Sequence, residues 1–170
     1  MEQYDYEYKQ DSMYCYPDSF ILKNKLNNRE QSVLEDVERN ITALSILELK
    51  QKPPKGKMNF KFLKMQHSHI FGDIYDWTGK VRNVNITKGN MFCDCRFIEQ
   101  MADAIFKELE DENYLQPYDV EKTADRLAYY LSEINALHPF REGNDRTQRL
   151  FIEILAERAG FEVDFSELSA

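Results

Sequence analysis

The sequence has little of what marks a membrane, secreted or nucleic-acid-binding protein. No apolar run approaches the ~20 residues that span a bilayer, and the acidic, tyrosine-rich first residues are unlike a signal peptide. Acidic residues outnumber basic ones by 30 to 22, which gives a net charge of −8. That balance disfavours a direct nucleic-acid partner, because the phosphate backbone attracts basic surfaces. We therefore expect a cytoplasmic protein that binds neither membrane nor nucleic acid.

Cysteine is also scarce. The chain has three, Cys15, Cys93 and Cys95, an odd number with no CxxC pair that would indicate a zinc site. We expect free thiols in a reducing compartment. What is present fits a globular protein, with 42% hydrophobic residues in a chain of 170. That length predicts one domain over residues 1–170, with residues 1–28 as an N-terminal arm that is extended except for a turn of helix around Phe20.

Apolar residues recur at helical spacing in five segments. The first begins at Glu30 and stops before Pro53, because proline cannot continue a helix. Its apolar side chains are expected on one face: Val33, Leu34, Val37, Ile41, Leu44 and Leu47. The other helices are expected at about residues 59–72, 97–109, 119–137 and 144–160. Asn59 and Asp119 are expected as N-caps of two of these helices, and Gly72 and Gly160 as the C-terminal ends of two.

Between the second and third helices the pattern changes to that of a short β-hairpin, which we place within residues 81–93. Val84 and Ile86 alternate with polar neighbours, and a turn signal at residues 87–90 separates them from Met91. An isolated hairpin is marginal in water and must rest on helices. A simple connector is the alternative interpretation. The predicted fold class is therefore mostly α-helical, with one small hairpin.

The segment between the last two helices concentrates polar groups of several kinds, and we name residues 138–149 the motif segment. Gly143 and Asn144 tolerate unusual backbone angles, so N–H groups at the start of a helix can converge on an anion. Arg146 and Arg149 lie three residues apart, hence side by side on the first turns of that helix. Because guanidinium groups bind phosphate in a fixed geometry, the segment predicts a phosphate site.

Two further residues indicate chemistry at that site. Glu142 precedes the turn, where a carboxylate can hold Mg²⁺ that bridges phosphates. His138 ends the preceding helix, where an imidazole can accept a proton from a hydroxyl. Each also has an ordinary structural interpretation. A histidine at a helix C-terminus favours the helix dipole, and Glu142 and Arg146 are spaced for a weak salt bridge. Their concentration in one short segment favours the phosphate site.

The motif segment resembles the motif of the Fic family, HxFx(D/E)GNGRxxR. Here it reads His138-x-Phe140-x-Glu142-Gly143-Asn144-Asp145-Arg146-x-x-Arg149. The resemblance extends to residues 71–89, which look like the family's lead into its flap, and to residues 22–26, which are similar to a segment of many bacterial members. It covers about residues 15–160.

The resemblance implies a helical core with the hairpin as a flap over the active site. It also implies a protein adenylyltransferase, which moves AMP from ATP to a Tyr, Thr or Ser hydroxyl of a target protein. By position, His138 is the base, Glu142 holds Mg²⁺, and Phe140 packs inward. The implied nucleotide-binding residues are Gly143, Asn144, Asp145, Arg146 and Arg149, with Lys88 and Gly89 of the flap. The flap residues implied to align the target's main chain are Thr87, Lys88, Gly89, Asn90, Met91 and Phe92.

Asp145 departs from the family pattern, because most members carry glycine there. Aspartate tolerates left-handed backbone angles, but a carboxylate near a triphosphate is repulsive unless it points away or meets the metal. In the Doc-type branch this position is lysine, and the reaction is phosphate transfer. The alternatives that stay open are a phosphotransferase on the same scaffold and a weakly active or inactive binding module.

Many members of the family silence themselves with an (S/T)xxxE(G/N) helix whose glutamate pairs with the final arginine of the motif. No Ser or Thr of this chain is followed four residues later by Glu. The resemblance therefore implies the toxin of a toxin–antitoxin pair, in which a small helical antitoxin supplies a glutamate to Arg149.

Overall fold

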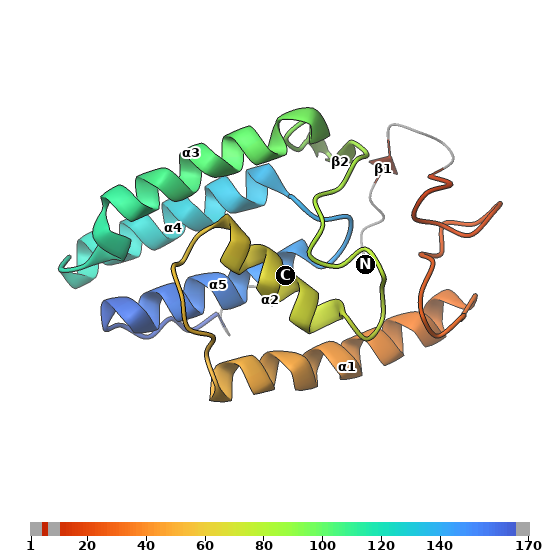
Figure 1. Cartoon of the computed structure of the whole chain (residues 1–170), viewed down its shortest axis with the longest axis horizontal. Helices are drawn as coiled ribbons and strands as arrows, with labels where there is room; N and C mark the ends of the chain where they lie inside the picture. Colours follow the sequence, from red (N-terminus) through yellow and green to blue (C-terminus); the bar gives the residue numbers. More distant parts are fainter. Residues whose placement is uncertain (1–4, 7–10, 166–170) are drawn as a thin grey trace.

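The computed structural model describes residues 5–6 and 11–165, and five α-helices make up most of this part (Figure 1). They are α1 (Gln31–Gln51), α2 (Phe60–Phe71), α3 (Ile98–Asp111), α4 (Val120–Leu137) and α5 (Asn144–Ala159). The strands β1 (Asp5–Tyr6), β2 (Ile86–Lys88) and β3 (Asn90–Met91) form a small antiparallel sheet in the order β1-β2-β3. Two short 3-10 turns, η1 (Cys95–Phe97) and η2 (Asn113–Leu115), flank α3. The prediction of a mostly helical fold with a small hairpin is confirmed.

Local capping explains where α2 and α4 begin and where α5 ends. The Asn59 side chain accepts a hydrogen bond from the Phe62 N–H (3.0 Å), and Asp119 accepts one from the Lys122 N–H (2.8 Å). These bonds satisfy N–H groups that have no partner inside the helix. At the other end of α5, Gly160 takes a left-handed conformation with φ 92°, which glycine adopts without strain. The caps confirm these boundaries of the predicted helices.

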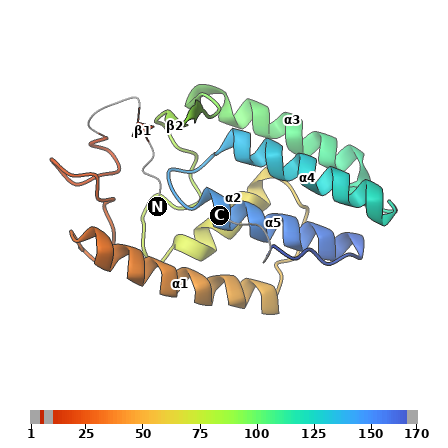
Figure 2. The ribbon, with the colours of Figure 1, turned by 180° about the vertical axis from the view of Figure 1, so that it is seen from behind.

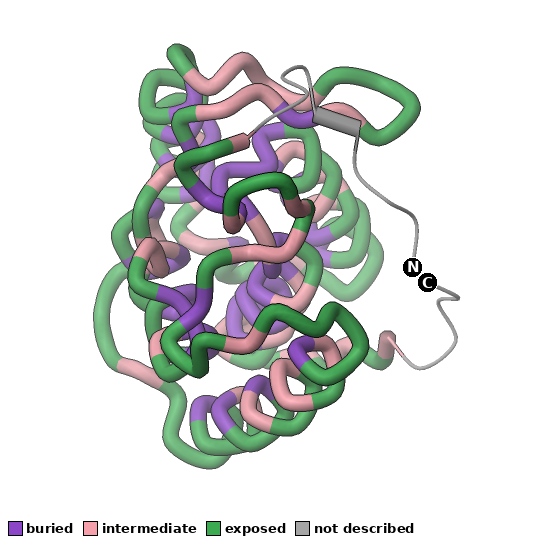
Figure 3. The backbone as a smooth tube through the Cα atoms, turned by 90° about the vertical axis from the view of Figure 1, so that its right-hand side faces the viewer, coloured by how far each residue is buried: buried purple, intermediate pink, exposed green. Residues whose placement is uncertain are grey.

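Helix α5 lies at the centre of the helical array. It packs against α4 and α2, while α3 lies along α4 and α1 lies along α2 (Figures 1 and 2). The residues of α5 that are buried include Leu150, Phe151, Ile152, Ile154 and Leu155. Buried positions gather toward the middle of the molecule, and the outer turns of the helices are exposed (Figure 3). None of the helices in residues 11–165 combines the length and hydropathy of a membrane span.

The inward face of α1 is not the one that its apolar periodicity predicts. Leu34 is buried, but Val33, Leu44 and Leu47 are 40%, 65% and 51% exposed. The buried residues of this helix are Leu34, Thr42, Ser45 and Leu49. Glu38 lies on the same side and forms an ion pair with Arg146 of α5. The predicted face is therefore rotated rather than absent, because Leu34 is buried and Ile41 packs against the core, whereas Leu44 and Leu47 do not.

The described part of the N-terminal arm, residues 11–28, contains no helix. The predicted turn of helix around Phe20 is replaced by a chain reversal that an isolated antiparallel bridge between Cys15 and Leu22 closes. Pro17 has no N–H to donate, and Asp18 adopts a left-handed φ of 53°. Both features favour a turn over a helix. The remaining arm residues, 1–4 and 7–10, lie outside the described part.

Candidate active site

The motif segment begins where α4 ends, at a residue with unusual backbone angles. His138 is the C-cap of α4 and is left-handed, with φ 44° and ψ 61°. Five residues further on, Gly143 is left-handed as well, with φ 78°. A side chain at Gly143 would place its Cβ 2.2 Å from the ring of Phe71. Only glycine therefore fits at this turn, which sets the start of α5.

Side chains of the segment itself hold the turn in place. The Asn144 amide accepts a hydrogen bond from the Phe140 N–H and donates one to the Phe140 carbonyl, both at 2.8 Å. The Thr147 hydroxyl donates to the Gly143 carbonyl (2.8 Å). Phe140 is 1% exposed. The backbone between His138 and α5 is thus fixed by the segment's own polar groups before any ligand is present.

His67 of α2 packs against the motif segment and hydrogen-bonds to its backbone. Its Nδ1 accepts a hydrogen bond from the Gly79 N–H (2.9 Å), so the ring proton lies on Nε2, which donates to the Glu142 carbonyl (2.9 Å). The ring stacks on Phe140, with centroids 3.9 Å apart. Burial lowers the pKa of His67 to about 4, so the ring is neutral at neutral pH. These contacts give His67 a structural role.

His138 is enclosed by the flap and by the start of that segment. Its imidazole is 3% exposed and stacks on Phe92, with centroids 3.8 Å apart and ring planes 9° apart. Burial lowers the pKa of His138 to about 3, and the positive charge of Arg82 adds to the effect. An imidazole with this pKa carries no proton charge at neutral pH and can accept a proton.

Arg146 is held by an acidic and aromatic environment at the start of α5. It forms a close ion pair with Glu38 and receives further contacts from the Thr42 hydroxyl (3.1 Å) and the Glu142 carboxylate (3.8 Å). Its guanidinium also lies over the Phe71 ring. Sequence reasoning missed Glu38, because nothing local links α1 to a residue more than a hundred positions away.

Arg149 pairs with the residue that departs from the motif. Its Nε lies 3.1 Å from the Asp145 Oδ1, and the two side chains are 32% and 59% exposed. Asp145 occupies the first turn of α5, where an acidic side chain is favoured by the helix dipole. Its carboxylate lies on the helix surface and pairs with Arg149, four residues further on. The two predicted phosphate-binding arginines both have carboxylate partners in this structure.

Glu142 is the one motif carboxylate that faces the helix start. Its Oε1 accepts a hydrogen bond from the Gly143 N–H (2.8 Å), and its side chain is 27% exposed. Burial and the neighbouring charge of Glu38 raise the pKa of Glu142. No group of three or more metal-ligating side chains occurs in residues 11–165. A single carboxylate, that of Glu142, fits an Mg²⁺ ion that takes most of its ligands from phosphates and water.

The flap lies over His138, and the chain's own N-terminal residues add a strand to it. Thr87 pairs with Met91 and Lys88 with Asn90 across the hairpin, and Gly89 turns with φ 71°. The other edge of β2 carries β1, with Tyr6 opposite Ile86. Among the described strands, β3 is at the end of the sheet and has no further partner on its outer edge. Strand β1 was not predicted from the sequence.

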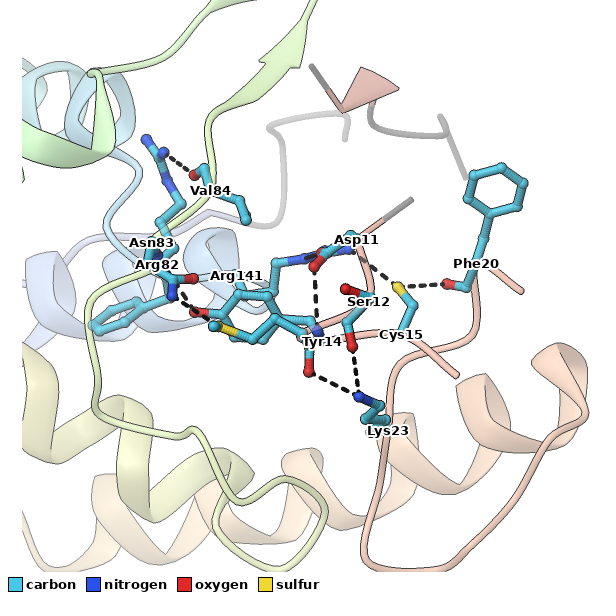
Figure 4. Close-up of polar contacts among 12 residues, drawn as sticks. Asp11, Ser12, Tyr14, Cys15, Phe20, Lys23, Arg82, Asn83, Val84 and Arg141 are labelled. Carbon is cyan, nitrogen blue, oxygen red and sulfur yellow. Dashed lines mark hydrogen bonds and ion pairs between the residues drawn. The ribbon is translucent and has the colours of Figure 1, made fainter. Parts of the chain in front are cut away.

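A buried ion pair ties the N-terminal arm to the motif segment (Figure 4). The Arg141 Nε donates to the Asp11 Oδ2 at 2.8 Å, and the two side chains are 1% and 5% exposed. The Cys15 sulfur accepts a longer bond from the same guanidinium (3.6 Å), and the Tyr14 ring lies beside it. No sequence signal identified Asp11. Its partner, Arg141, occupies a position at which the motif specifies no residue type.

Comparisons with known proteins agree with this geometry. The sequence model of the Fic/DOC family matches residues 57–156. The probable protein adenylyltransferase y4lH of Sinorhizobium fredii is 36% identical over 156 residues, which is 91% of this chain and 80% of y4lH. The protein adenylyltransferase VbhT of Bartonella schoenbuchensis is 38% identical over 91% of this chain, which spans only 33% of VbhT.

A solved structure has the same fold. The N-terminal Fic domain of a VirB-translocated Bep effector protein from Bartonella quintana, with bound ADP, superposes with a TM-score of 0.84 at 27% identity. The alignment covers 92% of this chain and 80% of that one.

Proposed function

This chain belongs to the Fic/DOC family, and from that membership we propose that it is a protein adenylyltransferase, a nucleotidyltransferase that uses ATP to modify a target protein. The observation that carries the proposal is the placement of a buried, neutral imidazole and an arginine-flanked helix N-terminus on one motif segment. The ADP bound by the solved Bartonella quintana domain supports nucleotide binding by this scaffold.

In the proposed reaction, His138 takes the proton of a Tyr, Thr or Ser hydroxyl on the target. The hydroxyl oxygen then bonds to the α-phosphorus of ATP, the bond to the β-phosphate oxygen breaks, and pyrophosphate leaves. The pKa of His138, lowered to about 3, keeps the imidazole neutral, so a ring nitrogen can take the proton, but it also makes this imidazole a weaker base than an ordinary histidine. N–H groups from Gly143 to Arg146 at the start of α5 would bind the negative charge on the phosphates.

Arg146 and Arg149 are proposed to bind the outer phosphates of ATP. Each already pairs with a carboxylate, Arg146 with Glu38 and Arg149 with Asp145, so a phosphate would take over part of these contacts. Glu142 is proposed to hold Mg²⁺ together with the phosphates, because its carboxylate lies at the start of the same helix. Bound there, the ion would neutralise negative charge that develops on the phosphates.

The flap is proposed to align the main chain of the target by strand addition. Residues 87–92 form the hairpin, and Phe92 stacks on His138. A strand that pairs beside Phe92 would bring its own side chain near the imidazole. The outer edge of β3 carries no described strand, whereas β1 would have to leave before a target could use the edge of β2. Lys88 and Gly89 at the turn are proposed to face the nucleotide.

We further propose that the protein is the toxin of a toxin–antitoxin pair and acts in the cytoplasm. The chain has no (S/T)xxxE sequence that would supply an inhibitory glutamate from within. A separate antitoxin helix would then bring a glutamate to Arg149, where it would compete with the outer phosphate of ATP.

A second candidate function is that of a weakly active or inactive binding module. The observation that favours it is the ion pair between Asp145 and Arg149. A carboxylate already occupies the arginine that an outer phosphate would use, and it repels the phosphate as well.

The experiment that tests both uses ATP labelled at the α-phosphate or at the γ-phosphate, incubated with the purified chain and a bacterial lysate. We expect α-label on protein, and a loss of about 10²–10⁴-fold in the His138→Ala variant, as for other general bases. The control is His69→Ala, which removes an exposed histidine that pairs with Glu48. Label from γ-ATP alone would indicate phosphotransfer. Absence of any label would favour the binding module.

A further inference from the structure

Arg82, which precedes the hairpin, is a fully buried arginine, and within residues 11–165 its guanidinium donates hydrogen bonds to main-chain oxygens. It is 1% exposed. It donates to the carbonyls of His138 (2.7 Å), Val84 (2.6 Å) and Cys93 (2.5 Å), and Figure 4 shows the bond to Val84. Its own N–H donates to the Pro139 carbonyl (2.9 Å). A single side chain therefore bonds to three separate segments of backbone.

This burial is costly and only partly offset, because nearby acidic groups such as Asp94 favour the charge of the guanidinium without forming an ion pair with it. Within residues 11–165, no carboxylate forms an ion pair with Arg82. Burial lowers the pKa of the guanidinium, which measures how unfavourable the site is for its charge. Packing alone would be satisfied by an apolar side chain at lower cost. The oriented fork of five N–H donors is what an apolar residue, or a lysine, cannot supply.

The three carbonyls lie at functionally distinct places. Val84 comes just before β2 and Cys93 just after β3, so Arg82 joins the two ends of the hairpin. The third carbonyl belongs to His138, whose left-handed φ of 44° is unfavourable for a residue with a Cβ. The Cys93 N–H donates in turn to the Ala136 carbonyl in the last turn of α4 (3.0 Å). Flap, helix end and histidine backbone thus meet at one guanidinium.

We propose that Arg82 is a positioning residue for the transfer reaction. It fixes the position of the flap relative to His138, so that a target strand bound to the flap places its hydroxyl next to the imidazole. The inference rests on the proposed function and adds a residue outside the motif segment. The hydrogen bonds of the Arg82 side chain do not reach Arg146, Arg149 or the N-terminus of α5, so Arg82 affects nucleotide binding only indirectly, through Lys88 and Gly89 of the flap. The chemical step, in contrast, depends on the hydroxyl-to-imidazole geometry.

The test compares Arg82→Gln and Arg82→Lys with the wild-type chain. The control is Arg96→Gln, which changes a 75% exposed arginine close to the end of the flap. With α-labelled ATP and lysate, Arg82→Gln should lower kcat by about 10²-fold, the size of loss expected from misplaced reacting groups. The KM for ATP should change much less than kcat, because only Lys88 and Gly89 of the flap link Arg82 to the nucleotide. Arg82→Lys should be intermediate, because it keeps the charge but loses the fork, and Arg96→Gln should behave as wild type.

A second readout does not require transfer activity. Hydrogen exchange at the Cys93 amide should become at least tenfold faster in both Arg82 variants, while the amide of buried Phe151 in α5 keeps its protection. By NMR, the imidazole pKa of His138 should rise in Arg82→Gln and less in Arg82→Lys. The charged groups near this imidazole are Arg82 and Lys88, and exposed His69 serves as the internal reference.

The outcomes separate the inference from the function on which it rests. A wild-type chain that transfers no label contradicts the proposed function, and the Cys93 exchange then still decides the role of Arg82. Unchanged kcat and unchanged Cys93 exchange in a folded variant overturn the inference. A rise in the KM for ATP that accounts for the whole loss of activity overturns it as well. If Arg82→Gln does not fold, the same criteria apply to Arg82→Lys.

Discussion

The motif segment is held by different kinds of contact at its two ends. At the His138 end, Arg82 and Arg141 are 1% and 2% exposed, and their partners are main-chain carbonyls and the buried Asp11. At the α5 end, Arg149 and Asp145 are 32% and 59% exposed. Buried charges are costly to separate, whereas exposed pairs contribute little. The proposed base is therefore held by contacts that are costly to break, while the proposed phosphate-binding end keeps contacts that a ligand can replace.

Removing the carboxylate of the buried pair should give the largest effect on stability. In Asp11→Asn, the charge of Arg141 stays buried without its partner, which typically costs about 3–5 kcal/mol. We expect the free energy of unfolding, measured by urea titration, to fall by this amount. The control is Asp36→Asn, which breaks a pair with Arg39 whose side chains are 69% and 71% exposed. That change should cost about 0–1 kcal/mol.

Equal losses in the two variants would contradict the distinction between a buried and an exposed pair. A double variant, Asp11→Leu with Arg141→Met, sharpens the test because it removes both charges and leaves neither one unpaired. It should regain much of the stability that Asp11→Asn loses.

Acid should also weaken the buried end. The pKa values of His138 and His67 in the folded chain are about 3 and about 4, below the value near 6.5 of an unfolded histidine. As pH falls from 6.5 toward 4, the unfolded chain binds protons that the folded chain cannot, so stability decreases. Each histidine contributes a slope of up to about 1.4 kcal/mol per pH unit. Glu142, with its raised pKa, acts in the opposite sense.

Urea titrations at several pH values between 4 and 7 measure this slope. The His67→Gln variant should be less stable at neutral pH, because Gln cannot reproduce the ring contacts, but its slope should be shallower by about one proton. His69→Gln should leave the slope as it is. A wild-type stability that does not change over this range would show that the two rings can take up protons while folded.

The smallest effect is expected at the exposed end. Pairs four apart on a helix surface are worth only a few tenths of a kcal/mol, so Asp145→Asn should change stability within that range. It should lower the KM for ATP by about twofold, because the carboxylate no longer competes for Arg149. Asp145→Gly tests the residue that is usual in the family. Equal AMP transfer by all three chains would show that this position is not limiting.

The sequence predicted the parts of the molecule whose causes are local. Apolar spacing and the capping side chains Asn59 and Asp119 located the helices, and the Gly143 turn located the start of α5. A cap or a glycine turn acts within a few residues, so its signal is readable in a short window. The inward face of α1 was only partly predicted, because its buried residues include Thr42 and Ser45, which carry no apolar signal.

The missed parts of the site share the opposite property. Asp11, Glu38 and Arg82 act on residues far away in the chain, at separations of 130, 108 and 56 positions. No periodicity links such partners, and each residue taken alone reads as an ordinary surface charge. Strand β1 was missed because two residues are too few to show the alternation of a strand. The catalytic roles within the motif segment remain predictions that the labelling experiment tests.

The separation between Asp11 and Arg141 has a consequence for how the molecule assembles. During synthesis the arm leaves the ribosome long before Arg141 does. Asp11 therefore cannot form its ion pair until a residue 130 positions later in the chain has been made. Closing so long a loop has an entropic cost that only the finished core can offset. Docking of the arm therefore belongs among the late folding events, with the slow rates expected for non-local contacts. A nascent chain would carry a complete set of motif residues before it has a working site.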